Sequence, residues 1–302
     1  MWFWLSLIAL LCWSGSDLFS KIGCRDADDK YSHLKMVIAV GTVMGLHAAF
    51  EIFVGGTEIS WDVIWTYLPV SLLYIGSMTL GYLGLRYIEL SVSSPICNSS
   101  GALVAVLTLL FVGTEDYTPL AYLAIALVCC GAIGLGVVDA REDPELRAAR
   151  QAEGNYKYAK SFLALALPVA YCLLDAAGTF ADNRVLETLN EDSANCAYEL
   201  TFLAAAVVCF VYVVLIRKDK LIPKLEGPKY LGAVCETAGQ FAYIYAIADT
   251  SHLAMSAPII SSYCAASVLW SRLFLKEKLS WKHYAMILLV VAGIVILGVY
   301  DI

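Results

Sequence analysis

Acidic side chains stand well inside segments that are otherwise apolar, and these residues are the best able to do chemistry. Asp17, Asp175 and Glu236 each lie several residues from the nearest end of such a segment. Placing a charged side chain in a membrane costs about 2.5–3.5 kcal/mol on insertion scales, so an ionisable residue there indicates a functional site. Each carboxylate is a candidate to bind a cationic solute and a candidate to carry a driving proton.

Asp17 has two interpretations. Trp13, Asp17 and Lys21 recur every four residues, which places them on one face of a helix. Asp17 is then either a proton or cation site beside the Trp13 ring, or one half of an intrahelical pair with Lys21 that neutralises both charges. Asp175 has Thr179 four residues on and no such basic neighbour, so it is the better candidate.

A stripe of polar residues follows one face of the segment that contains Glu236. Gln240 and Tyr243 come four and seven residues after Glu236, and the segment 64–86 contributes Tyr74 and Tyr82. We predict that these residues bind solute. The alternative is a set of interhelical hydrogen bonds of about 0.6–2 kcal/mol each, and tyrosine also occurs in interfacial belts. Such interhelical contacts do not require a carboxyl group as deep in the segment as Glu236, so we favour a functional role for this residue.

A histidine and a glutamate lie four residues apart in the segment 34–54. His47 and Glu51 could share a proton there, because histidine titrates near neutral pH. His47 is the deeper of the two and is a candidate for proton coupling. Glu51 comes just before two glycines at the end of the segment, so we expect it to be solvated at the headgroup boundary.

Prolines interrupt two segments at corresponding places. Pro95 and Pro258 each remove a backbone hydrogen bond. Weakened helices at matching places of two halves indicate a hinge or a binding site, whereas a harmless kink is the alternative. Asn98 beside the first break and Tyr263 beside the second are predicted to bind solute. Trp270 shares the face of Tyr263 and either walls the cavity or packs.

The composition explains why these residues must lie in a membrane. Of 302 residues, 60% are hydrophobic and only 16% are charged, and the mean hydropathy is +0.71. A soluble domain has about 45–50% apolar and 25% charged residues. The net charge of −7 argues against a nucleic-acid partner. The ten cysteines are scattered without a CxxC motif, so neither a disulfide framework nor a metal site is predicted, and no cofactor is expected.

Apolar segments of about 20 residues, the length that spans a bilayer, fill almost the whole chain. Ten such segments can be drawn, at 2–21, 34–54, 64–86, 92–112, 119–138, 161–181, 196–216, 229–248, 252–274 and 281–300. In lipid the backbone must satisfy its own hydrogen bonds, which favours a helical bundle. The first segment lacks a basic leader and a cleavage site, so it is predicted to be a retained helix rather than a signal peptide.

The basic residues indicate the orientation. With one exception, Arg184, every Lys and Arg falls in alternate links between the segments. The positive-inside rule places those links in the cytoplasm and both termini outside. Lys21 and Arg86 lie near segment ends, where long side chains are expected to extend outward to the headgroups. We expect a multi-pass protein of a bacterial cytoplasmic membrane.

The two halves of the chain resemble each other. Residues 131–139 read GAIGLGVVD, and residues 293–301 read GIVILGVYD. Similar offsets pair Pro95 with Pro258 and Asp17 with Asp175. Coincidence would explain one pair but is a poor explanation of all of them together.

This repeat predicts the fold. Residues 1–139 and 161–302 form the two repeats, and 140–160 form a charged cytoplasmic link. Each repeat holds five segments, and because five is odd the second repeat enters the membrane upside down. The predicted fold is an all-α membrane protein of ten transmembrane helices in two inverted repeats, the architecture of secondary transporters.

Three stretches resemble the EamA family of the drug/metabolite transporter superfamily. They read LLCWSGSDLFSKIG, SPICNSSGALVAVLTLLF and SAPIISSYCAASVLWSRLF, and their order and spacing are the specific part. The resemblance implies a transporter with two EamA-type repeats. It also implies that the third and eighth helices line a central cavity. By analogy with the small multidrug-resistance proteins, Asp17 and Asp175 correspond to their paired first-helix carboxylates.

The expected function is secondary active transport of a small polar metabolite, an amine, organic cation or amino acid, by alternating access. Its partners are then the solute, the lipid bilayer and, if transport is proton-coupled, protons; the oligomeric state is left open. The alternatives are a passive channel and a membrane-embedded enzyme that modifies lipid. The enzyme would need an acidic cluster at a helix end. The only such cluster, Asp26, Asp28 and Asp29, is predicted to be a solvated loop, so we expect no enzymatic activity.

Overall fold

The computed structural model describes residues 1–26, 28–88, 90–111, 117–141, 162–277 and 279–300, and every regular element in them is a helix. In the first half the elements are α1 (Trp2–Cys24), α2 (Ser32–Phe50), η1 (Glu51–Gly55), α3 (Trp61–Tyr87), α4 (Leu90–Cys97), α5 (Ser100–Phe111) and α6 (Pro119–Ala140). In the second half they are α8 (Phe162–Val185), α9 (Glu191–Phe210), η2 (Val211–Ile216), α10 (Pro223–Ala248), η3 (Thr250–His252), α11 (Leu253–Ser261), α12 (Tyr263–Phe274) and α13 (Trp281–Tyr300).

Eight helical stretches of the described chain are long and apolar enough to cross a membrane. α8 and α10 are not among them, although they contain 24 and 26 residues. The polar residues Glu236 and Gln240 lower the mean hydropathy of α10. The predicted link 140–160 lies almost entirely outside the described residues.

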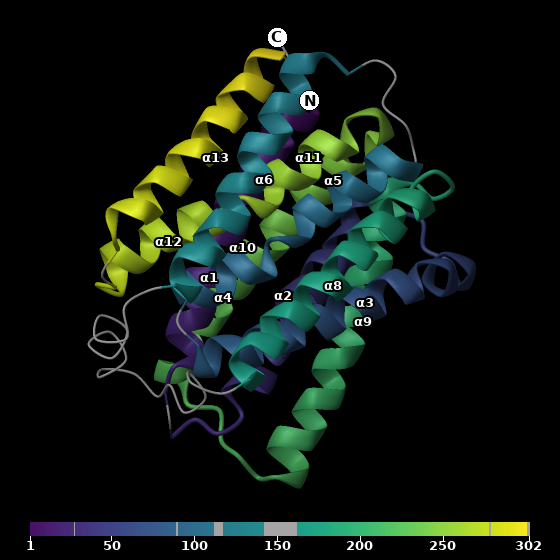
Figure 1. Ribbon diagram of the computed structural model, residues 1–302. Helices are drawn as coiled ribbons and strands as arrows, with labels where there is room; N and C mark the ends of the chain where they lie inside the picture. The colour runs from purple at the N-terminus through teal and green to yellow at the C-terminus, as the bar shows by residue number, and fades with distance from the viewer. Residues whose placement is uncertain (27, 89, 112–116, 142–161, 278, 301–302) are drawn as a thin grey trace.

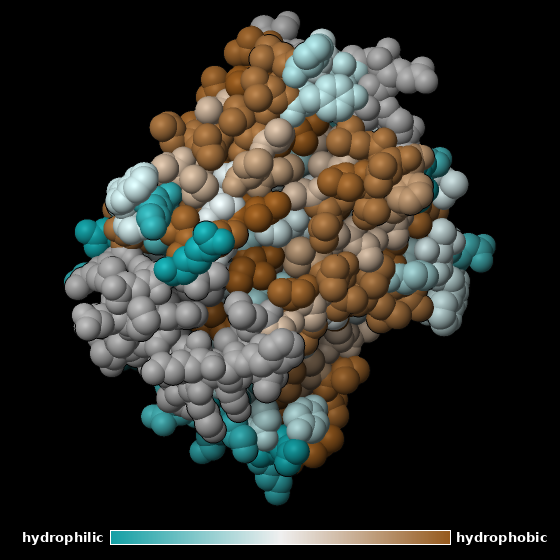
Figure 2. Space-filling model, in the orientation of Figure 1, coloured by the Kyte–Doolittle hydropathy of each residue, from teal (hydrophilic) through white to brown (hydrophobic). Residues whose placement is uncertain are grey.

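The outer surface of the bundle is apolar. Large hydrophobic side chains such as Trp65, Phe53 and Leu288 are more than half exposed. Figure 2 shows brown residues over much of the visible face, with teal residues at the lower end and at the left and right margins. Such a surface is unfavourable in water and favourable against lipid chains. Figure 1 places the two termini close together at the upper end.

The helices of the first half pair with those of the second half in a regular way. α1 packs along α10, and α3 packs along α8. The pairs α2–α9 and α6–α13 also join the two halves, as do the pairs α5–α11 and α4–α12 of the two divided segments.

The α6–α13 pair includes two glycines that lie directly against the opposite helix. A Cβ on Gly131 would lie 2.8 Å from the main-chain oxygen of Met286 and 2.6 Å from Val290. A Cβ on Gly293 would lie 2.7 Å from the main-chain oxygen of Ala124. The absence of a side chain at both positions therefore allows the two backbones to touch.

The predicted segments 92–112 and 252–274 are not continuous helices. The first divides after Cys97 into α4 and α5, and the second divides at Ser262 into α11 and α12. Pro95 and Pro258 lie just before these breaks, where each removes a main-chain donor. The Asn98 side chain donates to the Ser94 main-chain oxygen at 2.8 Å, which supplies a partner at the first break.

Candidate functional site

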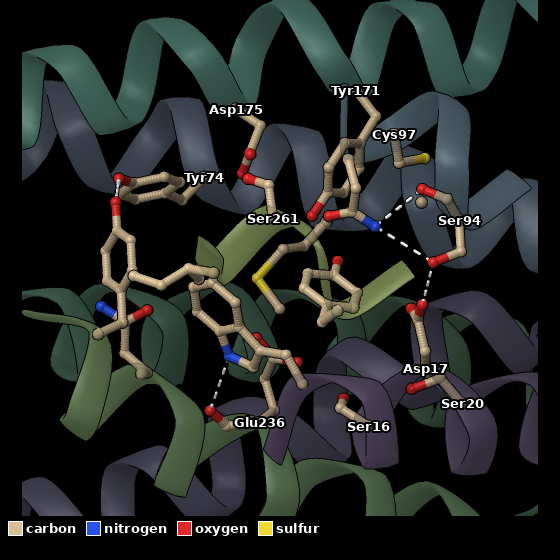
Figure 3. Close-up of a pocket in the computed structure, with 18 of the residues that line it drawn as sticks. Ser16, Asp17, Ser20, Tyr74, Ser94, Cys97, Tyr171, Asp175, Glu236 and Ser261 are labelled. Carbon is tan, nitrogen blue, oxygen red and sulfur yellow. Dashed lines mark hydrogen bonds between the residues drawn. The ribbon is translucent and has the colours of Figure 1, made fainter. Parts of the chain in front are cut away.

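A pocket of about 900 Å³, including its opening, lies among α1, α3, α4, α5, α8, α9, α10, α11 and α12. Asp17, Asp175 and Glu236 all line it, although they come from three different helices. Figure 3 shows Asp17 and Glu236 on one side of the space and Asp175 on another. The two helix pairs α1–α10 and α3–α8 bring these carboxylates together.

Asp17 is held by hydroxyl groups. Ser94 Oγ donates to its carboxylate at 2.5 Å and Ser267 Oγ at 2.8 Å. Lys21 donates instead to the main-chain oxygens of Leu85 and Ile88, each at 2.7 Å. The intrahelical Asp17–Lys21 pair is therefore not the arrangement that the structure shows.

Asp175 also has a serine donor. Ser100 Oγ, at the start of α5, donates to its carboxylate at 2.7 Å, and Ser261 lies beside it in the pocket. Ser100 and Ser261 stand at the two helix breaks. The interruptions of α4–α5 and α11–α12 therefore bring hydroxyl groups to the pocket.

Glu236 lies next to polar atoms that lack partners. The Gln240 amide nitrogen and the Tyr82 hydroxyl are buried without a hydrogen-bond partner among the described residues, and both residues line the pocket. Buried polar groups are nearly always satisfied in native proteins. These two atoms can therefore hydrogen-bond a solute or a water molecule.

Aromatic rings form much of the remaining wall. The Trp13 ring lies 5.0 Å from that of Tyr243 and 5.9 Å from that of Tyr263, measured between centroids, and its Nε1 donates to the Glu236 main-chain oxygen at 3.3 Å. Tyr74 also lines the pocket. Among the described lining residues there is no lysine or arginine, so the wall is acidic and aromatic.

The predicted hinges Pro95 and Pro258 lie outside this lining, and so do two residues predicted to bind solute or to couple protons. Trp270 donates through Nε1 to Ser14 Oγ at 3.0 Å, between α12 and α1. His47 lies between α2 and α9, where its Nδ1 is 2.9 Å from Glu199 and its Nε2 is 3.7 Å from Glu51. All the other predicted substrate-binding residues line the pocket, and their roles stay predictions.

Sequence analysis missed two fully buried carboxylates, Glu199 and Asp182. Glu199 lies in the predicted segment 196–216, where its partner His47 could not be recognised from spacing. Asp182 stands one residue beyond the predicted end of 161–181 and was therefore not considered. The interval of seven residues from Asp175 places both aspartates on one face of α8, and that signal could have found Asp182.

Asp29, in the loop between α1 and α2, corrects the prediction that the acidic cluster there is solvated. Asp29 is buried, and its carboxylate binds Lys35 at 2.7 Å and Lys229 at 2.8 Å. Burial alone raises the pKa of Asp29, but the hydrogen bonds from Lys229 and Lys35 outweigh it and hold the pKa below its usual value. The opposite charges compensate for the loss of solvation.

Lys21 and Arg86 also differ from expectation, because both are buried rather than extended to the headgroups. Arg86 donates to Ser32 Oγ at 2.6 Å and to the main-chain oxygen of Asp29. Main-chain acceptors near the end of α3 and in the loop after α1 hold these cations inside the bundle.

The EamA-like transporter family matches residues 165–299. The match lies within the second half of the chain and covers a little under half of the whole sequence. No curated protein matches the chain, whereas 28 chains of solved structures do. One, described only as a crystal structure of a protein, is 13% identical with a TM-score of 0.63, over 97% of this chain and 95% of that chain. At this identity the likeness concerns the fold alone.

The EamA-like match confirms the resemblance noted in the sequence. The match points to a transporter of the drug/metabolite type, and together with the apolar helices it supports an integral, multi-pass membrane protein. The family points to a small-molecule solute and to a function without catalysis. The matched region contains Asp175 and Glu236, and Asp17 lies outside it.

Proposed function

We propose that this EamA-like protein is a secondary active transporter that moves a small amine, organic cation or amino acid by alternating access. The observation that carries the proposal is the pocket itself, which holds three carboxylates, several aromatic rings and, among its described lining residues, no lysine or arginine. The proposed fold is ten membrane-spanning helices in two inverted repeats, 1–139 and 161–302, joined by 140–160.

The charge of the pocket favours a cationic group on the solute. A phosphorylated or carboxylate-only solute would bring like charges close to Asp17, Asp175 and Glu236 without a basic partner. An ammonium group gains from the carboxylates and from the faces of Trp13 and Tyr263, since cations bind to aromatic rings. The unpartnered donors near Glu236 can accommodate a polar or zwitterionic remainder.

The symmetry of the contacts supports alternating access. Exchange of the two halves turns the α1–α10 contact into the α3–α8 contact and the α5–α11 contact into the α4–α12 contact, and it leaves the pairs α2–α9 and α6–α13 in place. Two similar halves can exchange conformations and open one site to each face in turn. Asp17, Asp175, Glu236 and His47 are the candidates for proton coupling, and Pro95 and Pro258 are the candidate hinges.

The solute class can be tested by ligand-dependent stabilisation of the purified protein. We expect tetramethylammonium, an alkylamine or alanine to raise the melting temperature, because a ligand that binds the native state stabilises it. Inorganic phosphate at equal ionic strength is the control, and we expect it not to raise the melting temperature. Stabilisation by phosphate alone would contradict the acidic site.

Transport can then be measured in liposomes with the probe that stabilises best. Saturable uptake that a proton gradient accelerates fits a secondary transporter. A current that follows the membrane potential without saturation would show a passive channel, and it would overturn the proposal.

A further inference from the structure

A fourth carboxylate lies behind the pocket, and the proposed function does not use it. Asp182 is fully buried in α8, close to the end of that helix, and is not among the pocket-lining residues. It follows Asp175 by seven residues, which corresponds to about 10 Å along the helix toward the end that carries the termini. Asp182 is therefore separated from the solute space by other side chains.

Hydroxyl groups connect Asp182 to the pocket. Tyr67 Oη donates to one carboxylate oxygen at 2.7 Å, and Tyr74 Oη donates to the other at 3.3 Å. The Tyr74 hydroxyl also contacts those of Tyr243 and Thr179, and Tyr243 donates to Thr179 at 3.1 Å. Tyr74, Tyr243 and Thr179 line the pocket, so an unbroken series of hydroxyls runs from the solute space to the carboxylate.

No cation compensates the charge of Asp182 within the part of the chain that the structure describes. The titratable groups that face it are all tyrosines, namely Tyr67 and Tyr74 from α3, Tyr198 from α9 and Tyr243 from α10. The nearest arginine along α8, Arg184, pairs with Glu187 at 2.6 Å. A buried carboxylate without a counter-ion is costly to keep charged, so a proton can take the place of the missing cation.

We propose that Asp182 is a proton-binding site which exchanges protons with the pocket through the hydroxyls of Tyr74 and Tyr243. This inference rests on the proposed function, because it names the site at which a coupling proton resides. In each exchange one O–H bond forms at Asp182, and in the pocket either an O–H bond of a hydronium ion breaks to leave water or an N–H bond of an ammonium group breaks to leave the neutral amine. Every hydroxyl between them gives up one proton and accepts another, so the tyrosines begin and end neutral.

The exchange also changes what the pocket presents to the solute. When Asp182 is charged, the Tyr74 hydroxyl directs its hydrogen to the carboxylate. When Asp182 is protonated, that hydrogen is released toward Tyr243 and Thr179. Proton occupancy at Asp182 thus alters the hydrogen-bond donors available in the pocket without bringing solute and proton to one carboxylate.

Infrared difference spectroscopy on the full-length protein in liposomes tests this site with the proton as the only probe. A change of pH produces carbonyl bands of protonated carboxyl groups, and we expect Asp182→Asn to remove one band that Asp175→Asn retains. Asp62→Asn, at an exposed position at the start of α3, is the matched control and should retain the same band. An unchanged set of bands in Asp182→Asn overturns the proposal.

Two further variants keep the carboxyl group, in case Asp182→Asn does not fold. Tyr67→Phe and Tyr74→Phe each remove one hydrogen bond to Asp182, so each should move the band to a different frequency. A band at the wild-type frequency in both variants overturns the hydroxyl connection. Because no solute is needed, failure here is distinguishable from failure of the proposed transport function.

Discussion

Two groups of buried carboxylates, one at the end of the bundle and one around the pocket, have opposite electrostatic surroundings. Asp29 binds two buried lysines, Lys35 and Lys229, at 2.7 and 2.8 Å. Asp17 and Asp175 accept hydrogen bonds from serine hydroxyls. The charge at the end is already neutralised, whereas the charge in the pocket is available to a cation that arrives. Burial alone does not distinguish a structural carboxylate from a functional one, but its partners do.

The strongest test of this difference is to remove one lysine from the end site. Lys229→Met should destabilise the protein by about 3–5 kcal/mol, because it breaks the buried pairs of Lys229 with Asp29 and Glu226 and leaves the charge of Asp29 with Lys35 alone. The measurement is thermal unfolding of the purified protein. The double variant Asp29→Asn/Lys229→Met removes that charge and should recover part of the loss. A melting temperature equal to that of wild type in Lys229→Met would show that the pair is dispensable.

Removing a charge from the pocket should weaken ligand binding and leave the stability of the protein nearly unchanged, which is the opposite of the effect expected for Lys229→Met. Asp175→Asn and Glu236→Gln should each weaken binding of the stabilising cation by about 2–5 kcal/mol, the range found when one partner of a buried charge pair is truncated. Their melting temperatures without ligand should stay near that of wild type. Glu187→Gln, at an exposed position, is the control for the loss of one acidic group. Wild-type transport in both pocket variants would remove these carboxylates from the site.

The smallest expected effect is a pH dependence of the stability that Asp29 contributes through its pairs with Lys35 and Lys229. The pKa of Asp29 is lowered in the folded protein, so its contribution to stability is present above the unfolded value of about 3.9. That contribution is lost as the pH falls through the folded pKa. The difference in melting temperature between wild type and Asp29→Asn should therefore be constant near neutrality and shrink in acid. A difference that grows in acid would contradict this sign.

Much of the fold could be predicted because hydrophobic segments report directly on helices. The predicted segment 281–300 coincides with α13, and 119–138 differs from α6 by two residues at one end. The regular spacing of Glu236, Gln240 and Tyr243 placed them on one helix face, and all three line the pocket. Periodicity carries this information because each face of a helix meets one environment.

The rest could not be predicted because it depends on contacts between distant segments. Asp29 was predicted to be solvated in a loop. Only the packing of α2 and α10 brings Lys35 and Lys229 to it and buries it. Asp182 is buried by tyrosines that precede it by more than 100 residues. No local pattern encodes such pairings.

The glycine contacts between α6 and α13 have a consequence for leakage. Where a Cβ on Gly131 or Gly293 would meet the opposite backbone within 3 Å, no space remains for a water molecule or an ion. These contacts seal the seam between the two helices. A solute that reaches the carboxylates must therefore enter by a route other than these two contact points.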